Sequence, residues 1–219
     1  MPPVPYPLPY LERLPRIQSE SPPLVIMLHG RDAKAETIFS VEGMLDPNLH
    51  IISIQATYKS SDGKFEWFLP YDYDHPLESF SEEHFKDSEA ILTNMIAGIL
   101  EEKNISESNL FLLGFSQGAA MSYILSLRGN INPKGVIAMS GFFPRPIENW
   151  KSINMQPQFL ITHGSNDEVL PTTESIFAHT FLDSKGISSV YYEYKGRHKM
   201  TPQVIEYINN WIRSHGPQG

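Results

Sequence analysis

The stretch Leu110–Ala120, LFLLGFSQGAA, joins an apolar run to a serine that lies between two glycines. The run Leu110–Leu113 is typical of a buried strand, and the alanines after Gly118 suit the start of a helix. The motif G-x-S-x-G by itself also fits a glycine-rich loop, but a strand before it and a helix after it favour a tight strand-to-helix turn. The stretch therefore predicts that Ser116 presents its hydroxyl on a strained turn, beside helix amides that could stabilise a developing negative charge.

Apolar runs and amphipathic stretches alternate along the rest of the chain, which predicts an α/β protein. Five further strands are expected at Leu24–Leu28, His50–Ala56, Gly135–Met139, Gln158–Thr162 and Val190–Tyr194. Helices are expected at about Ala35–Leu45, Ser81–Lys103, Gln117–Leu127 and Thr172–Gly186, with a last one that begins after Thr201. This alternation indicates a mostly parallel central sheet with helices on both faces, whose catalytic groups lie beyond the carboxyl ends of the strands.

The domain organisation is expected to be simple. Residues 1–22 are rich in proline and predict an extended N-terminal arm with a short edge strand around Leu11–Ile17. Residues 23–215 predict a single domain, a normal size for this class. The connection Thr57–Phe80 is long and rich in aromatic residues, and long connections in compact domains are usually functional.

The composition indicates which partners and which cell compartment to expect. A net charge of −8, with no basic cluster longer than a pair, argues against nucleic acid and anionic membranes as partners. The chain has no cysteine, which excludes disulfides, thiolate metal sites and a cysteine nucleophile. The start lacks the features of a signal peptide, and the longest aliphatic run is far too short to span a membrane. These features predict a cytoplasmic protein with no membrane span; the oligomeric state is left open.

A serine nucleophile needs a base and an acid that orients the base. Among the eight histidines, His198 is the best candidate base, because it lies in a polar loop after a late strand. His29 and His163 lie at strand ends before glycine and are expected to brace their loops. Asp167 follows the preceding strand and is the expected acid, with Glu168 as its nearest competitor.

The oxyanion formed during such a reaction needs two amide donors. One should follow the nucleophile, and the other should lie on the loop after an early strand. These are the backbone amides of Gln117 and Arg31, respectively. The Arg31 side chain is then free either to steer an anionic substrate or to pair with a carboxylate.

Four segments together resemble the phospholipase/carboxylesterase family of α/β-hydrolases, which includes the acyl-protein thioesterases. The segments are LVIMLHGR, LLGFSQGAAMS, FLITHGSNDEVLP and YKGRHKMTPQVIEYINNWI, and they follow the family's order from about Pro23 to Ile212. The resemblance implies an α/β-hydrolase fold with little or no cap domain, a triad of Ser116, Asp167 and His198, and no metal or cofactor. The chain departs from the family at Arg31–Lys34, where a second glycine and a later acidic residue are common, and in the aromatic stretch Phe65–Tyr73.

The leading functional hypothesis is a serine carboxylesterase that acts on short- to medium-chain esters through an acyl-enzyme. A thioesterase or lysophospholipase with the same triad is the first alternative, and a binding protein with a vestigial site is the second. The partner in each enzymatic case is a small ester or acyl molecule. The aromatic residues expected to line the substrate pocket, if they do not instead belong to the core, are Trp67, Phe68, Tyr71 and Phe142.

Overall fold

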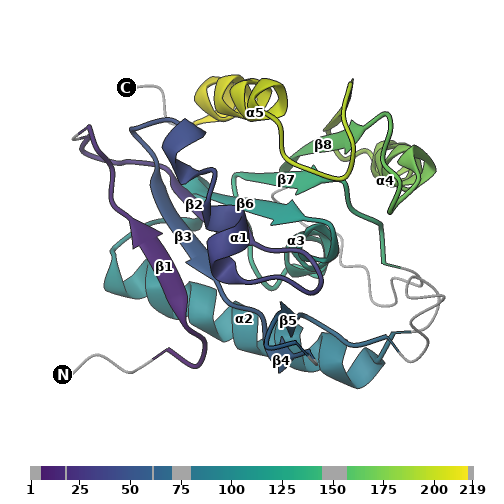
Figure 1. The fold of residues 1–219 in the computed structure, drawn as a ribbon. Helices are drawn as coiled ribbons and strands as arrows, with labels where there is room; N and C mark the ends of the chain where they lie inside the picture. Colours follow the sequence, from purple (N-terminus) through teal and green to yellow (C-terminus); the bar gives the residue numbers. More distant parts are fainter. Residues whose placement is uncertain (1–5, 18, 61, 71–79, 145–156, 217–219) are drawn as a thin grey trace.

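A computed structural model describes residues 6–17, 19–60, 62–70, 80–144 and 157–216. Its main sheet has seven strands in the order β1-β3-β2-β6-β7-β8-β9, and the ribbon in Figure 1 shows helices on both faces of it. The strands are β1 (Tyr10–Arg13), β2 (Leu24–Leu28), β3 (His50–Ile54), β6 (Leu110–Phe115), β7 (Gly135–Met139), β8 (Gln158–Gly164) and β9 (Ser189–Tyr194). All neighbours pair in parallel except β1, which runs antiparallel to β3 at the edge. The predicted mostly parallel α/β sheet is confirmed.

The central strands are unalternating apolar runs because both of their faces are covered. Every residue of β2 and β7 is buried. Alternate residues of β2 belong to two different core clusters: Leu24, Ile26 and Leu28 to one, Val25 and Met27 to the other. Burial on both sides is the reason that such strands lack the polar alternation of a half-exposed sheet.

Five α-helices cover the two faces. Helices α2 (Glu82–Glu102), α3 (Gln117–Leu127) and α4 (Thr172–Ser184) pack on one face, and α1 (Ala35–Phe39) and α5 (Pro202–His215) pack on the other (Figure 1). Helix α5 begins as its sequence predicts: the Thr201 hydroxyl accepts a hydrogen bond from the Val204 amide, and Pro202 is at the first position. The described residues also form two short 3₁₀ helices, η1 (Glu42–Met44) and η2 (Glu107–Asn109).

Three elements differ from the sequence-based expectation. The helix expected over Ala35–Leu45 ends at Phe39, where the Ser40 hydroxyl bonds back to the Thr37 carbonyl oxygen (2.7 Å) and Gly43 follows within η1. The edge strand expected around Leu11–Ile17 is shorter and starts one residue earlier, at Tyr10–Arg13, where it pairs with β3. The long connection after β3 contains a small hairpin, β4 (Tyr58–Lys59) and β5 (Phe65–Glu66).

Candidate active site

The turn at Ser116 has the strained backbone that the sequence predicts. Its φ is 54° and its ψ is −115°, in a region that non-glycine residues rarely adopt. A Cβ on Gly114 would overlap the Gly118 carbonyl group, and a Cβ on Gly118 would overlap the Leu28 carbonyl group. Both glycines are therefore required for α3 to start this close to β6 and β2.

The loops after β8 and β9 bring Asp167 and His198 together. Backbone hydrogen bonds continue past the strand ends, from the Ser165 amide to the Tyr194 carbonyl oxygen and from the Asn166 amide to the Gly196 carbonyl oxygen, both 2.8 Å. His198 Nδ1 donates to Asp167 Oδ2 at 2.7 Å, which leaves Nε2 as the nitrogen that can accept a proton. Glu168, the competing candidate acid, is exposed and pairs with Arg197 instead.

The Asp167 carboxylate is fully buried and saturated with donors. Its Oδ1 accepts hydrogen bonds from the Val169 and Leu170 amides, each 2.9 Å long. Burial alone would raise the pKa of Asp167, but the bonds from the Leu170 amide, the His198 ring and the Val169 amide outweigh burial and lower it. The carboxyl group is therefore held as an anion that can orient a histidine.

A second histidine, His163, also contacts this carboxylate. Its Nε2 lies 3.0 Å from the Leu170 carbonyl oxygen, which can only accept, so Nε2 carries the proton. The same nitrogen lies 3.2 Å from Asp167 Oδ2, and Nδ1 accepts from the Ser175 hydroxyl at 2.7 Å. Burial lowers the pKa of His163, so the ring is neutral and acts as a brace for the acid.

His29 fixes the direction of the predicted oxyanion amide. The Ala56 amide donates to His29 Nε2 at 3.0 Å, so the ring proton is on Nδ1, which donates to the Gly30 carbonyl oxygen at 2.7 Å. The Gly30 carbonyl and the Arg31 N–H belong to one planar peptide group, so this bond also orients the Arg31 amide. Burial lowers the pKa of His29 to about 4, which keeps this arrangement at neutral pH.

The two predicted oxyanion donors lie beside the nucleophile. Gln117 is the first residue of α3, so its amide has no partner within the helix. A Cβ on Gly30 would lie only 3.2 Å from the Ser116 Cβ, which shows how closely the loop of Arg31 approaches the serine. The arrangement suits the stabilisation of negative charge at this point.

The β4–β5 hairpin holds the loop that carries Arg31. Ala33 and Phe65 exchange backbone hydrogen bonds of 3.2 and 2.8 Å, so an isolated antiparallel bridge ties the loop to the hairpin. Asp32, whose φ of 51° is unusual, accepts bonds from the Ser60 hydroxyl (2.9 Å) and the Lys64 ammonium (3.2 Å). The sequence gives no local signal for these contacts, because they join residues about thirty positions apart.

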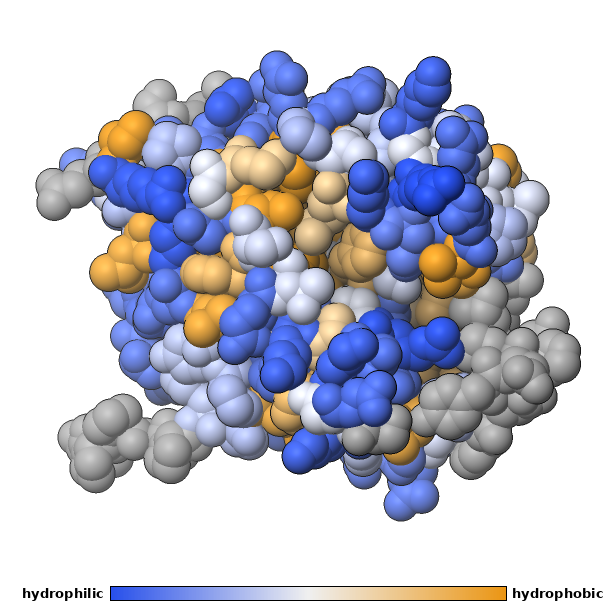
Figure 2. Space-filling view, in the orientation of Figure 1, coloured by the Kyte–Doolittle hydropathy of each residue, from blue (hydrophilic) through white to orange (hydrophobic). Residues whose placement is uncertain are grey.

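Ser116 and His198 line one pocket of about 370 Å³. Its other walls come from the loop after β2, from α1 and the residues just after it, from the end of β6 and from the loop before α5. They are His29, Gly30, Arg31, Ala33, Thr37, Ile38, Ser40, Val41, Phe115, Lys199 and Met200. The Phe115 ring packs against His198, with ring centroids 4.8 Å apart. Figure 2 shows the face on which α1 lies, where apolar residues gather near the centre and hydrophilic residues border them.

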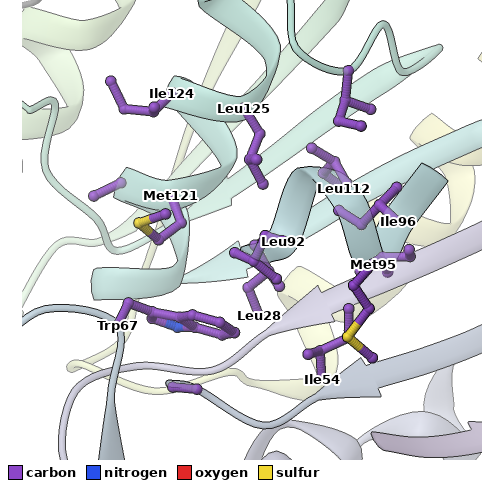
Figure 3. Packing of buried hydrophobic residues seen from close by; sticks show 14 of the residues in the cluster. Leu28, Ile54, Trp67, Leu92, Met95, Ile96, Leu112, Met121, Ile124 and Leu125 are labelled. Atoms are coloured by element: carbon purple, nitrogen blue, oxygen red, sulfur yellow. The ribbon is translucent and has the colours of Figure 1, made fainter. Parts of the chain in front are cut away.

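Three of the aromatic residues expected to line the substrate pocket lie in the hydrophobic core. Trp67 and Phe68 are fully buried in the core cluster under α2 and α3, and Figure 3 shows Trp67 near Met121, Leu92 and Leu28. Phe142 belongs to the same cluster and meets Phe68 edge-on. None of the three is among the described walls of the pocket that holds Ser116 and His198, and Tyr71 lies outside the described residues.

Both N–H groups of the buried Trp67 have hydrogen-bond partners. Its indole N–H donates to the His29 carbonyl oxygen (2.8 Å), and its amide donates to the Gln117 side chain (2.7 Å). Gln117 Nε2 in turn donates to the Phe68 carbonyl oxygen at 2.7 Å. The pocket walls from α1 were not predicted, although the amphipathic stretch that follows His29–Gly30 was the signal that could have found them.

Within the described ranges, no three His, Asp or Glu side chains gather as metal ligands would. No helix in the part of the chain that the structure describes is both long and apolar enough to cross a membrane.

This chain has a mostly parallel sheet, and a serine turn, an acid and a histidine follow its strands in that order along the chain. The combination is typical of the α/β-hydrolases. The sequence model of one of their families, phospholipase/carboxylesterase, matches residues 15–216, and the chain belongs to that family.

Curated relatives carry hydrolase names. Acyl-protein thioesterase 1 homolog 1 of Dictyostelium discoideum is 29% identical over 137 residues, 60% of each chain. Acyl-protein thioesterase 1 of Kluyveromyces lactis is 29% identical over 53% of each chain, and carboxylesterase SOBER1 of Arabidopsis thaliana is 26% identical over 67% of this chain and 66% of its own. The matches thus span only a little more than half of the first two relatives.

Solved structures share the fold. The Bacillus cereus carboxylesterase superposes with a TM-score of 0.82 at 17% identity and covers 95% of both chains. Arabidopsis thaliana SOBER1 superposes with a TM-score of 0.75 at 20% identity, over 88% of this chain and 98% of its own. These similarities support the α/β-hydrolase architecture.

Proposed function

We propose that this protein is a serine hydrolase that cleaves carboxylic esters of short to medium chain length through an acyl-enzyme on Ser116. The observation that carries the proposal is that Ser116, on a turn with positive φ, lines one pocket with a histidine bonded to a buried carboxylate. The names of the curated relatives support the same class of reaction.

The proposed reaction uses each group in turn. The Ser116 hydroxyl attacks the ester carbonyl carbon while His198 Nε2 takes its proton. The amides of Arg31 and Gln117 donate to the oxyanion, and Asp167 stabilises the charged imidazole. His198 then gives the proton to the leaving alcohol, and a water molecule, activated by His198, releases the acid and restores the serine.

The experiment is hydrolysis of 4-nitrophenyl esters, from acetate to palmitate, by the wild type and by Ser116→Ala. We expect wild-type activity to be greatest for short or medium chains, which the pocket volume suits, and kcat in the variant to fall by a factor on the order of 10³ or more. Ser184→Ala, on the exposed end of α4, is the matched control. Covalent labelling of Ser116 by a fluorophosphonate tests the nucleophile independently. A folded wild type that neither hydrolyses any ester nor reacts with the probe would support a vestigial site.

A thioesterase or lysophospholipase is the second candidate, and the names of two relatives favour thioester substrates. In a thioesterase the proposed groups would perform the same steps with a thiol as the leaving group, whereas in a lysophospholipase the leaving group would be an alcohol. Oxygen esters and thioesters with the same acyl chain separate the two: a kcat/KM at least tenfold higher for the thioester at every chain length would assign the thioesterase reaction.

A further inference from the structure

The pocket around Ser116 has a charge that differs from that of the whole chain. The chain carries a net charge of −8. Among the residues that the structure describes, the pocket walls nevertheless include the basic residues Arg31 and Lys199 and no aspartate or glutamate. Basic residues in a hollow of an acidic protein create a local field that attracts anions at short range.

The charge of Arg31 acts on two nearby acids, Asp32 and the buried Glu66, without forming an ion pair with either. Asp32, next to Arg31, is taken up by Lys64 and Ser60, and Glu168 pairs with Arg197 at 3.3 Å. Neither acid lines the pocket. Among the described residues, no carboxylate forms an ion pair with Arg31 or Lys199.

The position of the two residues connects them with the reaction. Arg31 carries the predicted oxyanion amide, and Lys199 directly follows the candidate base His198. The walls beside them are apolar, from Ile38, Val41 and Met200, with hydroxyls from α1. A molecule that fits such walls has a short hydrocarbon part and a negative group within reach of a cation.

We propose that the pocket selects esters that carry an anionic oxygen group, such as a carboxylate, on the acyl or the leaving part, bound by the Arg31 guanidinium and the Lys199 ammonium. This inference rests on the proposed function and defines its substrate class. A guanidinium suits it because its fork can donate two hydrogen bonds to one carboxylate.

The kinetic test compares esters that differ in charge. In the acyl arm, 4-nitrophenyl hemiglutarate is compared with 4-nitrophenyl pentanoate; in the leaving-group arm, 3-acetoxybenzoate is compared with its methyl ester. Each kcat/KM is divided by the ester's rate of hydrolysis by hydroxide, which removes differences in intrinsic reactivity. We expect the anionic ester to be preferred in at least one arm, and the preference to shrink when salt is raised from about 20 mM to about 0.5 M.

The variants test which residues cause the preference. Lys199→Gln and Arg31→Gln are each expected to lower the ratio of anionic to neutral kcat/KM by roughly threefold to tenfold. Lys199→Arg should restore it, and Lys134→Gln, an equal change of charge at an exposed position before β7, should leave it unchanged. A general effect of a variant on the chemical step would alter both esters alike, so it does not change the ratio.

A binding arm keeps the inference separate from the proposed activity. Calorimetry on Ser116→Ala measures the Kd of the same ester pairs without turnover, and the anionic member should bind threefold to tenfold more tightly. This preference in Kd should be lost when Ser116→Ala is combined with Lys199→Gln or with Arg31→Gln. If no ester is hydrolysed, the proposed function fails while this arm still decides the charge preference. Equal binding and equal kcat/KM within both pairs, or equal effects of the variants on both members, would overturn the inference.

Discussion

At the scale of single residues, the most heavily bonded group of the candidate site is the Asp167 carboxylate. One oxygen accepts from two backbone amides, and the other contacts the rings of His198 and His163. The two amides and His163 hold the carboxylate in place when His198 becomes charged or changes its orientation. His163 is therefore a positioning residue, which acts on the reaction through Asp167.

Replacement of His163 tests this role. His163→Leu removes the donor to Asp167, and we expect kcat to fall roughly tenfold with KM unchanged, because one hydrogen bond to a charged group is lost. His163→Gln, whose amide can reach the position of Nε2, should recover much of the kcat. Ester hydrolysis gives both constants, and circular dichroism checks the fold. An unchanged kcat in folded His163→Leu would mean that the amides and His198 alone hold the acid.

At the scale of elements, the β4–β5 hairpin and the start of α3 are joined by hydrogen bonds, and the hairpin in turn holds the loop of Arg31. The hairpin bonds to Asp32 and Ala33, and the segment after it is fastened to α3 by the Gln117 side chain. Gln117 thus has two separate roles: its backbone amide is the proposed oxyanion donor, and its side chain joins two elements.

The side-chain role of Gln117 predicts a large effect on stability. Gln117→Met keeps the length of the side chain but leaves the Trp67 amide and the Phe68 carbonyl without partners. Because both groups are buried, we expect the free energy of unfolding to fall by about 2–5 kcal/mol. Urea denaturation measures it. Gln203→Met on the exposed side of α5 is the matched control and should change stability by less than about 0.5 kcal/mol. A loss below about 1 kcal/mol in Gln117→Met would show that other groups replace both bonds.

At the scale of the whole molecule, the features that could be predicted from the sequence are those that local patterns encode. The apolar runs of β2 and β7 follow from burial on both faces, and the order of Ser116, Asp167 and His198 follows from their places after β6, β8 and β9. The burial of Trp67 could not be predicted, because it depends on bonds to His29 and Gln117, which are distant in the sequence.

Acidification should destabilise the whole molecule, largely through His29. The pKa of His29 is about 4 in the folded protein and 6.5 in the unfolded chain, so below pH 6.5 the unfolded state binds a proton that the folded state does not. Folding stability therefore falls as the pH drops from about 6.5 to about 4, and this one group accounts for about 3 kcal/mol of the loss. The lowered pKa values of His163 and Asp167 act in the same direction.

Urea denaturation of the wild type and of His29→Asn at about pH 7, 5.5 and 4 measures this effect. The variant is expected to be less stable at pH 7, because the Ala56 amide and the Gly30 carbonyl lose a shared partner. Between pH 7 and pH 4, however, its free energy of unfolding should fall by about 3 kcal/mol less than that of the wild type. Equal slopes for the two proteins would contradict a neutral, buried His29. Since the same neutral ring orients the peptide of Gly30 and Arg31, the pH range in which the fold is stable is also the range in which the proposed oxyanion donor is held in place.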